Sequence, residues 1–308
     1  MDALRKRRNS GMAVNMAIGP SCFVRCPGCY NHFAGTATKG GLVSRAEVSS
    51  FLQLAHAGGL RQVTFSGGDP LTHPEILDIL ADAKALNLYV KLDTVGTPLL
   101  GETETIFYGK RRVSAILPER LYGLVDQIGL PLDGFHGATQ ELFRKGRPQL
   151  NQETCKLIVQ LTRLGLNVCV NTVVHRSNLT EIRKVALLLL DLRPNLWQLF
   201  EYQPIGPLGS RTGGRFVLRH GEFEALRLSI EKLTRGRLEI DFKSRSLREG
   251  MYVMVDDAGT AWLPGVSGPE RRVLGSIQTD AAYVIANMKT AADGLDQDGD
   301  NPTGVQTA

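Results

Sequence analysis

Hydrophobic residues recur along this chain in two alternating patterns. Short runs rich in valine, isoleucine and leucine predict six strands, at residues 12–18, 62–68, 89–96, 125–134, 166–175 and 196–204. Between them, apolar residues at helical spacing predict helices at 44–59, 72–87, 151–165 and 178–192. Strands that alternate with crossover helices indicate parallel pairing in right-handed βαβ units.

The remaining segments depart from this alternation. Residues 98–120 show no clear period and predict an inserted loop with a short helix. After residue 210 the pattern predicts a helix at 220–236 and a hairpin at 250–265 that turns at 256–259. From residue 288 the composition becomes polar and acidic, which predicts a disordered tail.

Six strand–helix units are too few for an eight-stranded barrel but suit a curved, partly open one. The expected fold is therefore α/β, a partial (β/α)6 barrel with a small C-terminal α+β extension. The expected divisions are a basic arm at 1–11, the barrel at 12–210, the extension at 211–287 and the acidic tail at 288–308.

Composition narrows the class of protein. The 308 residues carry a net charge of +5 (36 basic minus 31 acidic), and no apolar run is long enough to cross a bilayer. The basic start lacks the apolar stretch of a signal peptide, so we expect a cytoplasmic protein with no membrane partner. A basic excess favours anionic partners, but no basic stripe is interleaved with aromatics, so we expect no nucleic acid.

Three of the five cysteines lie together after the first strand, as Cys22, Cys26 and Cys29. In a reducing compartment an odd number of cysteines argues against a disulfide framework. Three thiolates at this spacing can hold three corners of a [4Fe–4S] cluster and leave the fourth iron open. Zinc is the alternative, because His32 follows Cys29 by three residues and could complete a Cys₃His site.

A second motif follows the second strand, where Gly67 and Gly68 precede Asp69. Glycines at a strand end let a ligand approach the backbone closely. In a parallel sheet this strand end faces the same side as the cysteine loop. The glycine motif alone is weak evidence, but paired with the cysteine loop it indicates one ligand site.

Together these motifs resemble the radical S-adenosylmethionine (SAM) superfamily, over about residues 12–205. The resemblance implies that the three cysteines bind a [4Fe–4S] cluster whose unique iron is chelated by SAM. Reductive cleavage of SAM, with an electron from a donor such as flavodoxin or ferredoxin, gives a 5′-deoxyadenosyl radical that abstracts a substrate hydrogen. Gly67, Gly68 and Asp69 match the motif that holds the amino group of SAM.

The resemblance assigns further cofactor contacts. Most members carry an aromatic residue just before the third cysteine, near the adenine, where this chain has Gly28; Tyr30 is the candidate to compensate. By position, Asp93, Thr94 and Asp133 are the counterparts of activase residues that help to hold SAM or a nearby monovalent cation.

Two pairs of residues admit a functional and a structural interpretation. Arg144 and Arg147 could grip a carboxylate or another anion, or form an exposed basic loop. Asn171 and Thr172, at the end of the fifth strand, could bond SAM or simply cap the strand.

Substrate contacts are expected from alternating polar residues on two strands. Glu201 and Gln203 point the same way, and Lys91 and Asp93 alternate likewise on the third strand. Burying such groups unpaired costs about 1–3 kcal/mol each, so we expect them to line the substrate cavity. His136 and His175 are either acid–base groups or surface histidines, and Cys155 and Cys169 are expected to be small buried hydrophobic residues.

The sequence thus predicts a single-cluster radical SAM enzyme. The second half resembles members that act on peptides, nucleotides or sugars, and no cysteine follows residue 169 to bind an auxiliary cluster. We expect a polar, anionic small-molecule substrate, such as a nucleoside or sugar derivative, and natural-product tailoring by decarboxylation, deoxygenation, dehydrogenation or epimerisation. The alternatives are an activase that generates a glycyl radical on a partner protein and a peptide-modifying enzyme.

Overall fold

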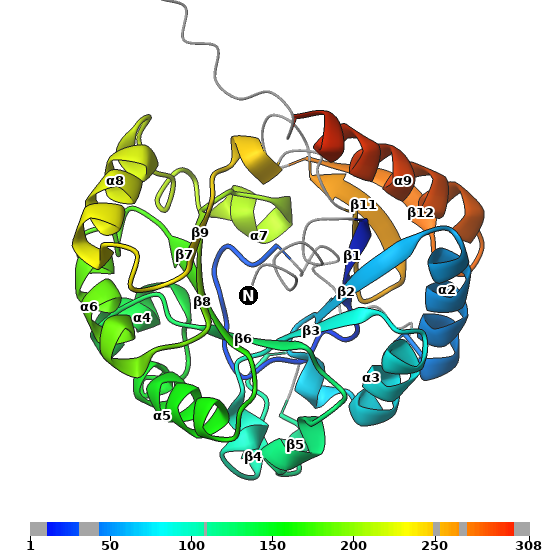
Figure 1. The fold of residues 1–308 in the computed structure, drawn as a ribbon, viewed down its shortest axis with the longest axis horizontal. Coiled ribbons are helices and arrows are strands. Elements are labelled where there is room, and N and C mark those ends of the chain that lie inside the picture. Colours follow the sequence, from blue (N-terminus) through cyan, green and yellow to red (C-terminus); the bar gives the residue numbers. More distant parts are fainter. Residues whose placement is uncertain (1–10, 31–42, 108–109, 249–252, 265–269, 299–308) are drawn as a thin grey trace, which may run out of the picture.

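The structure is a computed structural model that describes residues 11–30, 43–107, 110–248, 253–264 and 270–298. Its centre is a curved sheet of ten strands in the order β12-β11-β10-β1-β2-β3-β6-β7-β8-β9 (Figure 1). Six neighbouring strands pair in parallel and correspond to the six predicted strands: β1 (Met12–Ala17), β2 (Leu60–Ser66), β3 (Tyr89–Asp93), β6 (Gln127–Pro131), β7 (Val168–Val174) and β8 (Leu196–Glu201). The partial barrel is confirmed.

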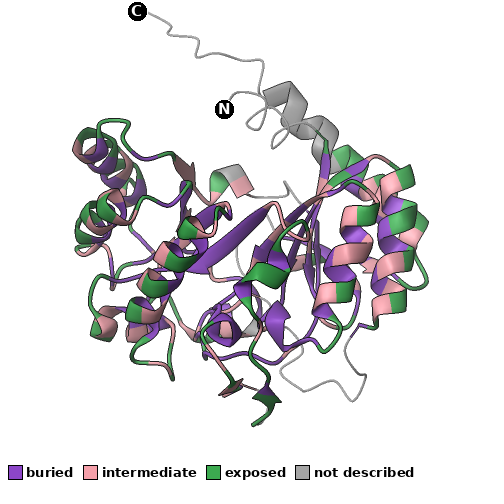
Figure 2. Ribbon diagram, turned by 60° about the horizontal axis from the view of Figure 1, so that its bottom comes forward, coloured by how far each residue is buried: buried purple, intermediate pink, exposed green. Residues whose placement is uncertain are grey.

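Helices cover the outer face of this sheet, as Figure 1 shows. They are α2 (Arg45–Ala57), α3 (Ile76–Ala85), α4 (Gly137–Phe143), α5 (Leu150–Arg163), α6 (Ile182–Leu192), α8 (Glu222–Thr234) and α9 (Ala281–Asp298). The strands are largely buried and the helices turn their exposed residues outward (Figure 2), so the main apolar core lies between the two layers. Helix α2 begins with a capping box, in which the side chains of Ser44 and Glu47 bond each other's backbone.

The C-terminal extension joins the barrel sheet at both of its edges. One edge gains β9 (Ile240–Lys243), which pairs in parallel with β8. The other gains β10 (Val253–Val255), which pairs in parallel with β1 and forms the predicted hairpin with β11 (Thr260–Pro264). A last strand, β12 (Arg271–Ser276), completes this edge. The extension therefore contributes walls to the barrel interior.

Short elements account for most differences from the sequence prediction. The insertion at 98–120 holds two 3₁₀ helices, η2 (Thr97–Leu99) and η3 (Pro118–Leu121), and a small ribbon of β4 (Thr103–Glu104) and β5 (Arg112–Val113). Neither α4, α7 (Gly206–Arg211), β9 nor β12 was expected, because runs of four to seven residues carry little periodic signal.

The expectation of a disordered tail from residue 288 is wrong for its first part. Helix α9 continues to Asp298, and its N-terminal portion buries Val284 and Met288 against the core. Residues 299–308 and almost all of the basic arm lie outside the described residues, as does His32. Among the helices of the described part, none combines the length and apolarity that crossing a bilayer requires.

Candidate functional site

A cavity of about 390 Å³ lies inside the barrel and brings nearly all predicted site residues together. Its wall includes the three clustered cysteines, the two motif glycines and most other residues predicted to contact cofactor or substrate, but not Asp69 or Asp133. Side chains from β1, β2, β3, β6, β7, β8, β9 and the β10–β11 hairpin contribute to this wall. Its volume is at the lower end of the range for small-molecule sites.

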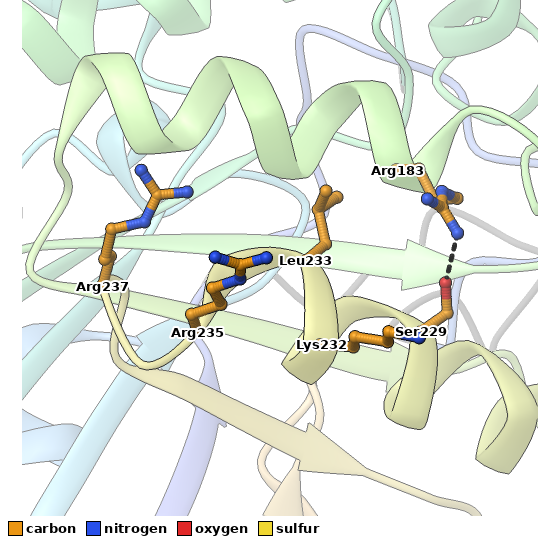
Figure 3. Close-up of a pocket in the computed structure, with 6 residues that line it drawn as sticks. All are labelled: Arg183, Ser229, Lys232, Leu233, Arg235 and Arg237. Atoms are coloured by element: carbon orange, nitrogen blue, oxygen red, sulfur yellow. Dashed lines mark hydrogen bonds between the residues drawn. The ribbon is translucent and has the colours of Figure 1, made fainter.

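A second hollow, of about 720 Å³, lies on the outer face between α6 and α8 (Figure 3). It is lined by Arg183, Ser229, Lys232, Leu233, Arg235 and Arg237. None of these is a thiol, an acid or a residue predicted to act, and the hollow is a basic surface feature. The barrel cavity is therefore the candidate active site.

The cysteine loop is held from two later segments of the chain. The carbonyl oxygen of Cys22 accepts hydrogen bonds from the backbone of Ile106 (2.9 Å) and Phe107 (3.2 Å). The backbone N–H of Arg25 donates to the carbonyl of Lys145 at 2.8 Å. The insertion after β3 and the loop after α4 thus fix the position of the thiols.

Burial disfavours the thiolate form of these cysteines, and one positive charge, that of Arg144, favours it at Cys26. Burial raises the pKa of Cys22 well above its ordinary value and raises that of Cys26. The guanidinium of Arg144 lies 4.0 Å from Cys26 Sγ and opposes the second effect. Arg144 donates in turn to the buried carboxylate of Asp133 at 2.6 Å. Burial lowers the pKa of Arg144, but the charges of Asp133 and Cys26 outweigh it and keep the guanidinium cationic.

The donor set fits the predicted iron–sulfur cluster. Three thiols on one loop line the cavity beside a fixed positive charge, which suits an anionic thiolate-bound cluster. In the part of the chain that is described, no three His, Cys, Asp or Glu side chains converge as a single bound ion requires. A cubane cluster needs no such convergence, because each thiolate binds a different iron.

The two motif glycines permit a close approach of two backbone segments. A Cβ on Gly68 would overlap the carbonyl oxygens of Pro20 and Ser21, and one on Gly67 would lie 2.8 Å from the Gly19 oxygen. Hydrogen bonds from Gly68 N to Gly19 O (2.6 Å) and from Asp69 N to Ser21 O (2.7 Å) close this contact. The glycines therefore position the segment that leads into the cysteine loop, besides lining the cavity themselves.

Asp69 does not reach the cavity, contrary to the expectation that its carboxylate faces SAM. It accepts hydrogen bonds from Thr94 Oγ1 (2.8 and 2.9 Å), Val95 N (2.6 Å) and Leu71 N (2.9 Å). Burial raises its pKa to about 6, although these donors act in the opposite direction. Asp69 ties the end of β2 to the loop after β3 and so orders Thr94, which does line the cavity.

Tyr202 fills the space beside Gly28, where most relatives were expected to have an aromatic residue. A Cβ on Gly28 would lie within 3.0 Å of three atoms of the Tyr202 ring. The ring packs edge-to-face on Phe143 and Phe216, with centroids 5.7 Å away in each case. Tyr30, the expected substitute, packs near Ile205, Met254 and Trp262 instead. The ring next to the third cysteine is thus supplied by the end of β8.

The predicted polar residues of β3 and β7 meet across a glycine. Asn171 donates to the Asp93 carboxylate at 3.0 Å. Gly129 lies between their strands, and a Cβ there would overlap the carboxylate and lie 2.5 Å from Asn171 Nδ2. Gly129 therefore leaves the space in which this pair faces the cavity.

A polar network crosses the barrel interior below this pair. Lys91 donates to Gln198 at 3.3 Å, and Gln198 donates to Asp241 of β9 at 2.9 Å. Cys169 Sγ lies 3.4 Å from the Asn171 side-chain oxygen and 3.5 Å from that of Gln198. Cys169 is buried as expected, but its surroundings are polar.

Glu201 and Gln203 both line the cavity, with different partners. Glu201 accepts from the backbone and the guanidinium of Arg245 at 2.9 and 3.1 Å. Gln203 is only 9% exposed, and its side-chain oxygen has no hydrogen-bond partner. This orphaned acceptor is open to an N–H or O–H of a ligand.

Other singled-out residues have structural roles. Arg147 pairs with Glu153, His136 with Glu181, and Thr172 bonds Leu132 and Trp197. His175 is buried between Phe143 and Phe216, and burial lowers its pKa to about 4. None of the four lines the cavity.

Comparisons with known proteins agree with this geometry. Residues 16–189 match the model of the radical SAM superfamily. The S-adenosylmethionine-dependent nucleotide dehydratase of Flammeovirga pacifica is 23% identical over 266 residues, which cover 84% of each chain. A PqqA peptide cyclase of Streptomyces rochei is 28% identical over 191 residues, 60% of this chain but only 46% of the cyclase.

Solved structures share the fold at low identity. Streptococcus suis SuiB bound to S-adenosylmethionine superposes with a TM-score of 0.65 at 13% identity, over 96% of this chain and 70% of SuiB. The protein anSMEcpe with bound AdoMet gives 0.60 at 14% identity, over 89% of this chain and 79% of that one.

Proposed function

The chain belongs to the radical SAM superfamily, and we propose that it abstracts hydrogen from a polar, anionic small molecule such as a nucleoside or sugar derivative. It is an enzyme that uses a [4Fe–4S] cluster and SAM, as the superfamily does. The observation that carries the proposal is the shared cavity, which is lined by both the cysteine loop and a set of polar side chains.

We assign different roles to the residues that line this cavity. Cys22, Cys26 and Cys29 would hold the cluster, with Arg144 beside Cys26. When bound, the cluster and SAM supply reductive cleavage of SAM and abstraction of a substrate hydrogen, with an electron from a donor such as flavodoxin or ferredoxin. Gly67, Gly68, Thr94, Tyr30 and the Asp93–Asn171 pair line the part available to SAM.

Substrate contacts are proposed for the ends of β3 and β8. Lys91, Glu201 and Gln203 line the cavity, and the unpartnered oxygen of Gln203 would accept a hydrogen bond from a substrate hydroxyl or amine. The radical chemistry requires that water be excluded from the cavity once SAM and substrate are bound. The similarity to a nucleotide dehydratase over most of both chains supports a nucleotide-like substrate.

The test is anaerobic reconstitution followed by a screen for substrate-dependent 5′-deoxyadenosine. Nucleoside phosphates and sugar phosphates are compared with short peptides and with glycyl-radical partner proteins. We expect turnover with a small phosphorylated molecule, and about 5- to 150-fold less with Gln203→Leu, since an unmet polar contact costs about 1–3 kcal/mol. Gln160→Leu, on the exposed face of α5, is the control. Turnover with peptides or partner proteins alone would overturn the small-molecule assignment.

A further inference from the structure

Two cationic side chains of the C-terminal extension reach the barrel cavity. Lys243 is the last residue of β9, and Arg248 ends the following 3₁₀ helix, η4 (Ser246–Arg248). Both line the same cavity as the cysteines. Because β9 runs parallel to β8, Lys243 lies at the carboxyl edge of the sheet, where ligands of parallel α/β sheets bind (Figure 1).

The segment from Asp241 to Arg248 carries one positive charge more than its acidic partners neutralise. Lys243 pairs with Asp241 at 2.9 Å, and Arg245 pairs with Glu201 at 3.1 Å. Arg248 donates instead to backbone carbonyls, those of Ser244 (3.3 Å) and Glu201. Within the described residues, no carboxylate lies at ion-pair distance from Arg248, so its charge faces the cavity uncompensated.

Arg248 is positioned and still has hydrogen-bonding capacity. Its guanidinium lies 5.8 Å from the centre of the Phe200 ring, which restricts its orientation. An arginine has five N–H donors, of which the two carbonyls occupy two. Such a planar, partly free fork suits bidentate binding of an oxyanion.

A polar acceptor lies close to this cation. Gln203, whose buried oxygen has no partner, follows Glu201 by two residues, and the Glu201 carbonyl accepts from Arg248. Two residues span at most about 7 Å. One small molecule can therefore place a hydroxyl or amine on Gln203 and an anionic group on Arg248.

We propose that Lys243 and Arg248 form a subsite for a phosphate group of the substrate. Arg248 supplies the uncompensated charge and free N–H donors for two phosphate oxygens, and Lys243, which is paired with Asp241, supplies a further N–H donor for a third. The loops after the last strands of α/β barrels commonly bind phosphate, and β9 is the seventh parallel strand in line from β1. This inference rests on the proposed function and narrows its substrate to a phosphorylated molecule.

Binding of inorganic phosphate and pyrophosphate to the reconstituted holoenzyme tests the subsite. Calorimetric titration should show affinity at least about tenfold weaker in Arg248→Gln and Lys243→Gln, as expected for losing a charge-assisted bond. Arg248→Lys keeps the charge and should retain part of the affinity for phosphate. It therefore serves as the control that distinguishes loss of the charge from misfolding. Arg237→Gln removes one charge from the outer hollow and should change nothing. The proposal is overturned if phosphate affinity falls only in Arg237→Gln, or if acetate competes for the site as well as phosphate does.

Kinetics separate this inference from the proposed function. For a phosphorylated substrate, Arg248→Gln should raise KM more than it lowers kcat, and the dephosphorylated analogue should show no such difference. Phosphate binding that depends on Arg248, without turnover of any anionic small molecule, would refute the proposed function only. Turnover of such molecules with KM unchanged in Arg248→Gln and Lys243→Gln would refute the subsite only.

Discussion

Replacing Gly28 with alanine should force the cysteine loop away from the end of β8. The added Cβ would lie 2.7 Å from Cε2 and 2.9 Å from Cζ of Tyr202, with the phenolic oxygen nearer still. Real side chains essentially never make such contacts, so either the loop or the ring must move. Overpacking of this kind costs about 1–3 kcal/mol of unfolding free energy.

The ring cannot easily turn aside. Phe143 and Phe216 hold it edge-to-face, and its hydroxyl lies 3.1 Å from Thr212 Oγ1. We therefore expect the loop to shift, which would weaken SAM binding as well as stability. Anaerobic urea unfolding and equilibrium SAM titration of the holoenzyme measure the two effects.

A double-mutant cycle identifies the cause. Tyr202→Leu removes all three ring atoms that the new Cβ would meet, at its own cost of a cavity. In that background Gly28→Ala should cost much less, giving a coupling of about 1–3 kcal/mol. Costs that add to within about 0.5 kcal/mol would refute the reasoning, because the alanine would then destabilise the loop without contact to the ring.

Three further predictions concern Cys26 of the cysteine loop and two residues near that loop, Asp69 and Arg144. Because burial raises the pKa of Asp69 from 3.8 to about 6, its proton is bound more tightly in the folded state; the unfolding free energy should fall by up to about 3 kcal/mol between pH 4 and 6. Asp69→Asn should flatten that slope in urea titrations across pH, and an unchanged slope would contradict it. Arg144→Gln should cost about 3–5 kcal/mol, since it leaves Asp133 buried and unpaired. It should also make the cluster potential more negative in a spectroelectrochemical titration, and a positive shift would contradict this. Cys26→Ala should abolish bound iron and sulfide, which Cys155→Ala retains; equal loss in both would argue against Cys26 as a ligand.

The sequence was sufficient to predict the parts of the site whose chemistry depends on one residue type. Three thiols at fixed spacing and a glycine pair after a strand indicate a cluster site whatever surrounds them, and both line the cavity. The pattern of hydrophobic residues located the six parallel strands because it, too, is local in the sequence. The partners of these residues depend instead on tertiary contacts that no local pattern encodes.

Two examples show this limit. Tyr202 packs on Gly28 across most of the barrel sequence, so only the folded chain shows which ring replaces the missing aromatic residue. The strand that ends in Lys243 has four half-buried residues and no alternation of buried and exposed positions, so its contribution to the cavity was not predicted. The motif assigned Asp69 to the binding of SAM. In the structure its carboxylate instead accepts hydrogen bonds from Thr94 and Val95.

The extension also links the two sides of the six-stranded barrel sheet. The chain leaves β9 at one edge and begins β10 at the other after the nine residues 244–252, which can span at most about 30 Å. This covalent connection limits the distance between the end of β9 and the start of β10. Arg245 and Arg248 fasten its first half to Glu201, at the end of β8. The segment that carries the proposed phosphate subsite is thus also the start of the connection between the two sides of the barrel sheet.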